Sequence, residues 1–138
     1  MSTDDNVKLV KSIMDEFMRT GDPAAFFAAL ADDAVIKAII PDGTPISGDF
    51  RGREGFARYF ERLAEVMEIL GMRDIDYVGS ATKVVVLGVE KARVKRTGTI
   101  FECETATVFT LDQGKITTVA ALADMSAIVD AYRVESAQ

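Results

Sequence analysis

Residues 84–124 decide the fold, and they read VVVLGVEKARVKRTGTIFECETATVFTLDQGKITTVAALAD. The first six residues are apolar and mostly β-branched, which favours a strand over a helix. From Glu90 onward, side chains alternate in character from one residue to the next, as they do along a strand with one buried face. Thr97-Gly98 and Gln113-Gly114 supply turn residues between the alternating segments. The stretch therefore predicts a meander of three antiparallel strands.

The charges of the first hairpin support one register. With Thr97-Gly98 at the tip, Arg93 lies opposite Glu102, and Lys91 lies opposite Glu104. Each cross-strand pair of opposite charges contributes about 0.2–1 kcal/mol. A slip of one residue would separate these pairs and turn the apolar side chains to the other face. We therefore predict this register for the hairpin.

The meander then places two acidic residues on its apolar face. Glu90 lies opposite Thr105 in the first hairpin. With a two-residue loop in the second hairpin, Thr105 lies opposite Leu122, and Cys103 lies opposite Asp124. Standard sheet spacings separate the Cα atoms of Glu90 and Asp124 by roughly 11 Å. A longer second loop would instead place Asp124 on the outer face.

Length and hydropathy predict a single globular domain over residues 1–138, of which residues 1–5 are polar and expected to be disordered. Hydrophobic residues make up 49% of the chain, which argues against global disorder. No apolar run approaches the ~20 residues of a membrane span, and no basic, then apolar leader opens the chain. We therefore expect a soluble cytoplasmic protein that does not enter the membrane.

Charge and residue usage restrict the chemistry. The net charge of −6 argues against nucleic acid as a partner, because phosphate contacts require clustered Lys and Arg. The single cysteine excludes an internal disulfide and a cysteine-based metal site. The absence of histidine removes the commonest general base and the commonest metal ligand. We expect no metal and no cofactor, so acid–base chemistry would fall to carboxylates, Lys, Tyr or Cys.

Periodicity and turn residues place the remaining elements. A helix capped by Asn6 is predicted to run to about Thr20, a second helix covers 24–30, and the longest helix covers 53–70 with Gly71 after its end. Strands are predicted over 34–40 and 72–80, residues 41–52 form a turn and surface loop, and a short helix covers 126–132. This order is that of an α+β fold, with helices on one face of a curved sheet.

Five short motifs occur in the order and spacing of a known superfamily. They are Gly21-Asp22, the run from Ala31 to Val35, Gly52-Arg53-Glu54, the run from Asp112 to Ile116, and Asp124. Together they resemble the nuclear transport factor 2-like superfamily, and within it the SnoaL-like group. The resemblance implies a cone-shaped mixed or antiparallel sheet with three helices on its concave face. It assigns no activity, since the superfamily includes isomerases, cyclases, hydrolases and members that only bind or assemble.

The resemblance eliminates some activities and leaves others open. Met14, Ala38 and Cys103 stand where ketosteroid isomerases carry the oxyanion-hole tyrosine, the general base and the protonated acid, so steroid isomerisation by that mechanism is not expected. Asp124 and Glu90 match the two aspartates of limonene epoxide hydrolase, but Gly88 replaces the arginine between them. SnoaL-like cyclases use an aspartate near the position of Asp124 as acid/base.

Each site residue has two readings. Asp124 is either an acid/base group or the N-cap of the helix that follows, and the two roles are compatible. Glu90 is either a buried assisting acid, with a pKa raised by desolvation, or a strand-end glutamate that reaches solvent or a lysine. Aromatic, methionine and small side chains on the predicted inner face are either core or ligand-binding residues. We assign the ligand-binding role to Met14, Phe17, Phe56, Tyr59, Phe60, Cys103, Thr105 and Leu122.

The outer face of the meander is predicted to be apolar, with Val85, Leu87 and Val89 beside Ala106 and Val108. Such a patch exceeds what a monomer normally exposes and predicts a homodimer through the sheet. Two hypotheses of function follow. The first is a cofactor-free lyase, isomerase or hydrolase acting on a small apolar molecule. The second is a module of the same fold that binds an apolar ligand or dimerises without catalysis.

Overall fold

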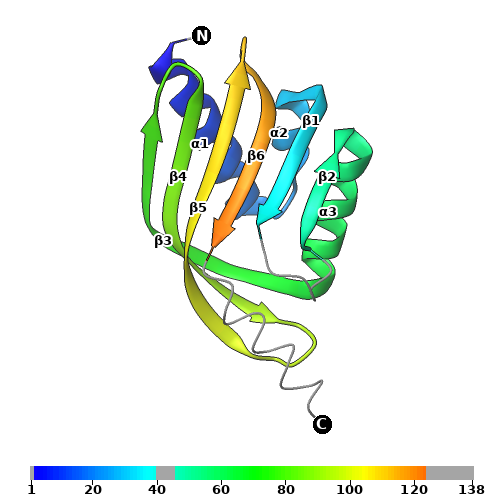
Figure 1. Cartoon of the computed structure of the whole chain (residues 1–138). Helices are drawn as coiled ribbons and strands as arrows, with labels where there is room; N and C mark the ends of the chain where they lie inside the picture. Colours follow the sequence, from blue (N-terminus) through cyan, green and yellow to red (C-terminus); the bar gives the residue numbers. More distant parts are fainter. Residues whose placement is uncertain (1, 40–45, 124–138) are drawn as a thin grey trace.

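The computed structural model describes residues 2–39 and 46–123, which form three helices and one six-stranded sheet (Figure 1). The helices are α1 (Thr3–Thr20), α2 (Ala24–Ala29) and α3 (Gly52–Val66). The strands are β1 (Leu30–Ile39), β2 (Gly48–Arg51), β3 (Met67–Gly79), β4 (Lys83–Val94), β5 (Ile100–Asp112) and β6 (Lys115–Ala123). The predicted α+β class is confirmed.

The sheet is curved, open and mixed, with the strand order β2-β1-β6-β5-β4-β3. All neighbouring strands are antiparallel except β1 and β6, which are parallel. In Figure 1, α1 and α2 lie behind the sheet, and α3 lies beside β1 and β2. The three predicted antiparallel strands of the meander are β4, β5 and β6.

Helix α1 begins earlier than its sequence predicts. Ser2 is the N-cap: its hydroxyl accepts a hydrogen bond from the backbone N–H of Asp5 at 3.1 Å, and the Asp5 carboxylate accepts one from the Ser2 N–H. The predicted cap at Asn6 is wrong. The Asn6 side chain is buried and donates to the carbonyl oxygen of Ala81 at 3.0 Å, which joins α1 to the β3–β4 connection.

The β4–β5 hairpin has a longer loop than the predicted Thr97-Gly98 pair. The N–H of Val94 donates to the carbonyl of Thr99 at 2.8 Å, so four residues, 95–98, form the loop. The strand register consequently moves by two residues, and Glu90 lies opposite Cys103 rather than Thr105. Because side chains alternate with a period of two, a shift of two residues preserves every face assignment.

The same shift changes the charge pairs. Lys91 lies opposite Glu102, so the predicted pairings of Arg93 with Glu102 and of Lys91 with Glu104 are wrong. Arg93 instead contacts Glu68 of β3 at 3.1 Å, and Glu102 contacts Arg73 of β3 at 3.1 Å. The charges on this face therefore join β4 and β5 to β3.

The β5–β6 hairpin contains a bulge that reverses the face of its distal residues. The ladder shifts by one residue between Leu111 and Thr110. Leu122 consequently lies opposite Ala106, and Ala123 takes the predicted place of Leu122 opposite Thr105. The predicted pairing of Thr105 with Leu122 is wrong. The predicted pairing of Cys103 with Asp124 lies outside the described residues.

Other boundaries also differ from the predictions. Residues 48–51, predicted as loop, form the short strand β2 against β1. Helix α3 ends at Val66, and β3 begins at once with Met67. Gly71 is therefore a residue of β3 and not a helix cap. The predicted helix over 126–132 and the turn over 41–45 lie outside the described residues.

The buried side chains form two clusters. The larger one joins α1, α2 and α3 to the sheet and includes Phe56 and Phe109, both completely buried. The smaller one lies where β3 crosses β4 and β5, and it includes Met67 and Cys103. Tyr59 of α3 packs against both clusters. The space between the clusters is where the candidate site lies.

Candidate functional site

The inner face of the sheet changes from large to small side chains along β4, β5 and β6. Near the β5–β6 turn, three apolar side chains oppose one another across the strands, those of Val84, Phe109 and Val119. Four residues further along each strand, the opposing residues are Gly88, Thr105 and Ala123. Side chains this small do not reach the helices, so the strands enclose space at this end.

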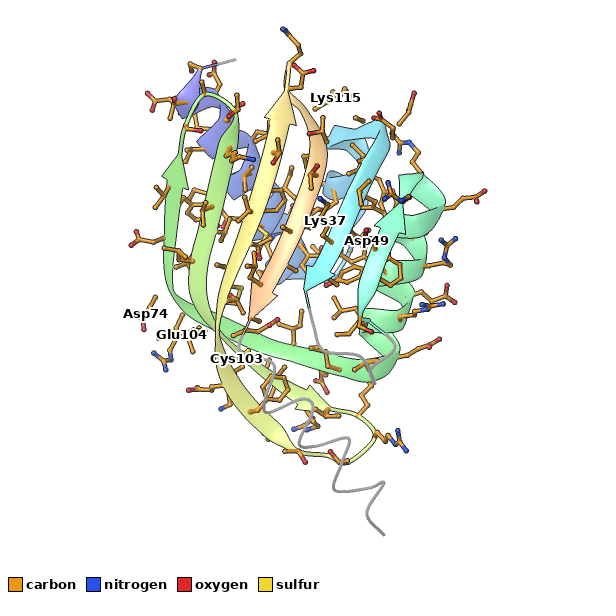
Figure 2. The ribbon with its side chains drawn as sticks, viewed as in Figure 1. Lys37, Asp49, Asp74, Cys103, Glu104 and Lys115 are labelled. Atoms are coloured by element: carbon orange, nitrogen blue, oxygen red, sulfur yellow. The ribbon has the colours of Figure 1, made fainter. Side chains whose placement is uncertain are left out.

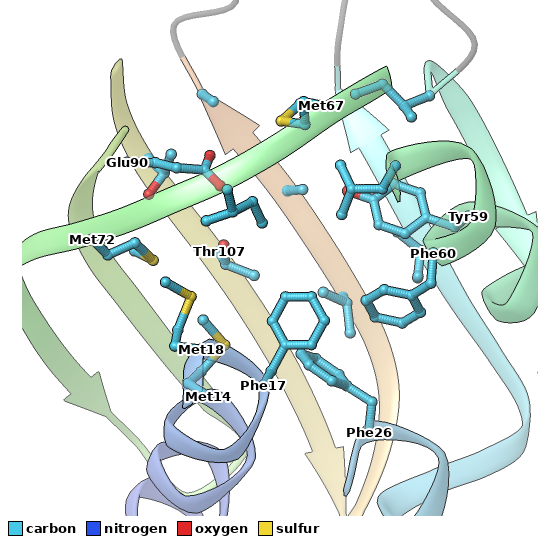
Figure 3. A pocket seen from close by; sticks show the side chains of 18 of the residues that line it. Met14, Phe17, Met18, Phe26, Tyr59, Phe60, Met67, Met72, Glu90 and Thr107 are labelled. Atoms are coloured by element: carbon cyan, nitrogen blue, oxygen red, sulfur yellow. The ribbon is translucent and has the colours of Figure 1, made fainter. Parts of the chain in front are cut away.

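That space is a cavity of about 130 Å³ between α1, α3, β3 and the inner face of the sheet (Figure 3). An apolar cavity of ~150 Å³ engineered in another protein stays dry and takes up benzene. The volume here thus corresponds to about one six-membered ring. Most of its surface is hydrocarbon or sulfur, and its polar side chains are those of Tyr59, Glu90, Thr105 and Thr107.

An aromatic wall closes one side of the cavity. Phe17 lies with its ring centroid 5.6 Å from that of Phe26 and 5.5 Å from that of Phe60. The centroids of Phe26 and Phe60 are 5.2 Å apart, so the three rings form a mutually packed triangle. Edge-on and tilted pairs at these distances are favourable and hold each ring in place. The wall is therefore a rigid surface against which a ligand can pack.

Glu90 is the charged residue of the cavity. It is half-buried on β4, and no other described lining residue carries a charge. Among the described residues, none forms a hydrogen bond or an ion pair with its carboxyl group. Burial raises the pKa of the Glu90 carboxyl above its ordinary value. Among the described residues, no lysine pairs with Glu90.

Tyr59 faces the same cavity from α3, across from Glu90 (Figure 3). Burial, together with the nearby charge of Glu90, raises the pKa of Tyr59 to about 12. The phenol is therefore uncharged at neutral pH and able to donate a hydrogen bond. Its ring is held edge-on against Phe50, with the centroids 5.3 Å apart. The cavity thus has a hydroxyl donor on one wall and an acid with a raised pKa on the other.

Methionine forms much of the remaining wall. The four methionines that the structure describes all line the cavity, and they are Met14, Met18, Met67 and Met72. Methionine side chains are flexible and polarizable, so such a wall adapts to ligands of different shapes. Sequence reasoning found Met14 and missed the other three. The spacing of Met14 and Met18, four residues apart on α1, was a signal for the second of them.

The predicted site residues are mostly gathered at this cavity. Its lining includes Glu90 and seven of the predicted ligand-binding residues, Met14, Phe17, Phe56, Tyr59, Phe60, Thr105 and Leu122. Leu122, at the end of β6, occupies an outer-face position opposite Ala106 and borders a hollow on that face as well. Cys103 is not part of that lining. It is buried in the smaller cluster beside Ala92 and Phe101. Asp124 lies outside the described residues.

Residues 2–39 and 46–123 contain no group of three or more His, Cys, Asp or Glu side chains placed to hold a metal ion. None of the helices in these ranges is long and apolar enough to cross a membrane.

The SnoaL-like domain family model matches residues 10–119, which include the second half of α1, most of the residues that line the cavity and most of the sheet. The chain belongs to the SnoaL-like family. No curated protein matches this SnoaL-like chain.

Solved structures share its nuclear transport factor 2-like fold. One, from Burkholderia xenovorans, is 28% identical with a TM-score of 0.83, covering 96% of this chain and 98% of its own. Another, from Burkholderia thailandensis, is 26% identical with a TM-score of 0.77, covering 95% and 98%. A third, from Pseudomonas putida and provisionally assigned as a polyketide cyclase, is 18% identical with a TM-score of 0.74, covering 91% and 96%. At that identity the third likeness shows the fold alone.

Proposed function

We propose that this SnoaL-like chain binds a small, uncharged and mainly apolar carbonyl compound in the cavity and moves protons on it without a cofactor. The observation that carries the proposal is Glu90, an acid with a raised pKa in a cavity whose other described lining residues are uncharged. A carboxyl group that remains protonated closer to neutral pH is the form that donates a proton. Proton transfers of this kind take part in many lyase, isomerase and cyclase reactions.

The reaction step that we propose is enolisation. Glu90 gives its proton to the carbonyl oxygen while a base removes a proton from the neighbouring carbon. The electrons of the broken C–H bond form the C=C bond of the enol, and Glu90 is left as a carboxylate. Tyr59 donates a hydrogen bond to the same oxygen as charge develops there. General acid–base catalysis of this kind contributes roughly 10²–10⁴-fold in rate.

We assign the role of the base to Asp124. It directly follows Ala123, which lines the cavity and ends β6. An ionised Asp124 beside a protonated Glu90 would divide the work between two carboxyl groups whose surroundings separate their pKa values. The resulting enol can then reprotonate elsewhere or attack a second carbonyl group, which distinguishes isomerisation from ring closure.

Exchange of carbon-bound hydrogen tests this step without knowledge of the natural substrate. Acetophenone in D₂O reports enolisation as the gain of deuterium in its methyl group, measured by NMR. We expect the protein to accelerate this exchange, and Glu90→Gln to reduce the acceleration roughly 10²-fold or more. Glu104→Gln is the matched control, since Glu104 is exposed and lies opposite Val89 on the outer face. Acceleration that survives Glu90→Gln would contradict the assignment.

The alternative function is ligand binding without catalysis. It is favoured by the chemistry of the described lining, which offers one carboxyl group, one phenol, two threonines and no Arg, Lys or His. The same experiment separates the two functions. Binding of acetophenone without accelerated exchange would identify a binding module, whereas binding with exchange would identify an enzyme.

We also propose that two copies pair through the outer face of the sheet, which no described helix covers (Figure 1). Val78 is 55% exposed, Leu87 is 40% exposed and Leu122 is 38% exposed. Val78 and Leu87 are on the outer face of β3 and β4, and Leu122 is beside them on β6. The charged Glu104 borders this group, since it lines the same surface hollow as Leu87 and Leu122. Figure 2 places Lys37 away from it, on β1. An apolar centre with charged surroundings is typical of interfaces.

Light scattering coupled to size exclusion tests the pairing. The expected mass is that of two chains, and Leu87→Lys is expected to give a monomer. Leu70→Lys is the control, because Leu70 is 38% exposed on the helix side of β3, away from this face. A wild-type protein that is monomeric at micromolar concentration would overturn the proposal.

A further inference from the structure

A second hollow lies next to the cavity. It is a groove of about 610 Å³ bounded by the end of α1, the start of α2, one face of α3 and the start of β3. Six residues line both the cavity and the groove: Phe17, Met18, Phe60, Leu63, Met67 and Ile69. In Figure 3, Phe17 and Met18 project from α1 and Met67 lies on β3, at the edge of the cavity. The two hollows therefore lie next to each other, with the shared side chains between them.

The volumes indicate how a ligand would divide between them. The inner cavity, at about 130 Å³, corresponds to about one ring. Binding sites for small molecules usually measure ~300–1,000 Å³, a size that the cavity reaches only together with the groove. A ligand larger than one ring must therefore extend past Met18 and Leu63. Both side chains can move by rotamer changes, and methionine does so at low cost.

The charges indicate what kind of ligand fits. Glu90 in the cavity and Glu61 in the groove are the charged residues among the described lining of both hollows. No described lysine or arginine lines either one. An anionic ligand would bury its charge next to carboxyl groups with no cation to compensate, which is costly. The remainder of the groove is apolar, including Phe27, Ala57, Ala64 and Leu70.

We propose that the ligand is an elongated, uncharged molecule: a ring with a carbonyl group in the inner cavity, joined to a hydrocarbon chain or further rings in the groove. This proposal rests on the proposed function for the placement of the carbonyl beside Glu90. It adds a substrate class and a second subsite. The groove selects for length and apolar character, and the absence of described cations selects against carboxylates of the same size.

A series of aryl ketones tests the length requirement. Acetophenone, butyrophenone and hexanophenone share the ring and carbonyl, and differ only in the chain that would occupy the groove. Each buried methylene contributes about fourfold in affinity, the fold-change that corresponds to ~0.8 kcal/mol. Ordering the chain reduces this gain. Calorimetric titration should therefore give at least thirtyfold tighter binding for hexanophenone than for acetophenone.

The same titration tests the charge requirement. The anion 6-phenylhexanoate has a ring and a chain of comparable length, and its carboxylate is ionised at pH 8. We expect it to bind at least tenfold more weakly than hexanophenone at this pH. Equal or tighter binding of the anion would overturn the inferred preference for uncharged ligands.

Variants on α3 test whether the groove holds the chain. Ala64 is exposed and lines the groove but not the cavity, so Ala64→Trp fills the groove alone. Its neighbour Glu65 is exposed and lines neither hollow, so Glu65→Trp is the matched control. We expect Ala64→Trp to weaken the binding of hexanophenone at least tenfold and to leave the affinity for acetophenone within twofold of the wild-type value. Glu65→Trp should leave both affinities within twofold of the wild-type values.

The outcomes separate this inference from the proposed function. If acetophenone binds and the series shows no gain with length, the groove subsite is wrong while the proposed function stands. If Ala64→Trp weakens both ketones equally, the groove subsite is likewise overturned. If neither acetophenone nor hexanophenone binds to the wild-type protein, both the proposed function and this inference fail.

Discussion

The two ends of the inner sheet face are built from the same three strands and differ in what the strands carry. At one end, Val84 and Phe109 are completely buried against the helices. At the other, Gly88 and Thr105 leave the cavity in which Glu90 lies. Close packing contributes most of the stability of a domain, and a cavity gives some of it up. The comparison teaches that the cavity forms where the side chains become too small to fill the fold.

The largest expected effect is a loss of stability when a side chain at the packed end of the sheet is truncated. Phe109→Ala removes a completely buried ring and should lower the free energy of unfolding by about 3–5 kcal/mol. Thr107→Ala, two residues away on the same face, borders the cavity and should cost about 1 kcal/mol or less. Urea denaturation of both variants measures the difference. Equal losses would show that the two ends do not differ in packing.

Filling the hollow end should abolish binding while sparing the fold. Ala121 lines the cavity, so Ala121→Leu would occupy much of its volume and weaken ketone binding at least tenfold. Ala120→Leu is the control, because Ala120 is on the opposite face of β6, across from Val108. Calorimetry with acetophenone measures both. A leucine at 121 that leaves affinity unchanged would place the ligand elsewhere.

The carboxyl group of Glu90, in the cavity, should make the stability of the folded chain depend on pH. Because the pKa of Glu90 is raised in the folded state, the folded chain retains its proton over a range in which the unfolded chain has lost it. The contribution of Glu90 to stability is therefore full below its ordinary pKa of about 4.3 and declines as the pH rises through the folded value.

Glu90→Gln should remove this decline in stability with rising pH. The stability of the variant relative to wild type is expected to increase from about pH 4 upward and to level off above the folded pKa. Urea midpoints measured across this range test the expectation. A variant that becomes less stable relative to wild type as the pH rises would mean that folding lowers the pKa of Glu90.

The smallest effect is expected on the outer surface, away from both ends. Arg93→Ala removes the 3.1 Å ion pair with Glu68, and both side chains of this pair are largely exposed. Exposed pairs contribute ~0–1 kcal/mol, less at high salt. Denaturation at low and high salt should therefore show a loss of about 1 kcal/mol or less that shrinks as salt is added. A larger, salt-independent loss would indicate that the arginine acts through packing.

Sequence periodicity predicted the faces of β4 and β5 because a strand's pattern repeats every two residues. The β4–β5 loop proved two residues longer than predicted, an error that leaves Glu90 on its predicted face. The bulge near Thr110 shifts the ladder by one residue instead, and Leu122 consequently changed partner and face. A bulge depends on how the sheet bends against neighbouring strands, and the local pattern does not encode this.

The cavity was predicted in part for the same reason. Residues with helical or alternating spacing, such as Phe17, Phe60 and Thr105, were assigned to it from their own elements. Met67 and Met72 were missed because α3 ends four residues before its predicted end and β3 crosses the cavity in its place. Gly71 has the signal of a helix end, and tertiary pairing of β3 with β4 overrides that signal.

The pKa of Glu90 tests the central claim most directly. Carbon-13 labelling of the glutamate side chains, with Glu90→Gln to assign the resonance, gives this value by NMR titration in the absence of any ligand. An acid enclosed by hydrocarbon, with no described cation beside it, should titrate clearly above the ordinary value of about 4.3. A pKa at or below that value would mean that the carboxyl group is solvated or paired with a cation, and it would contradict the account.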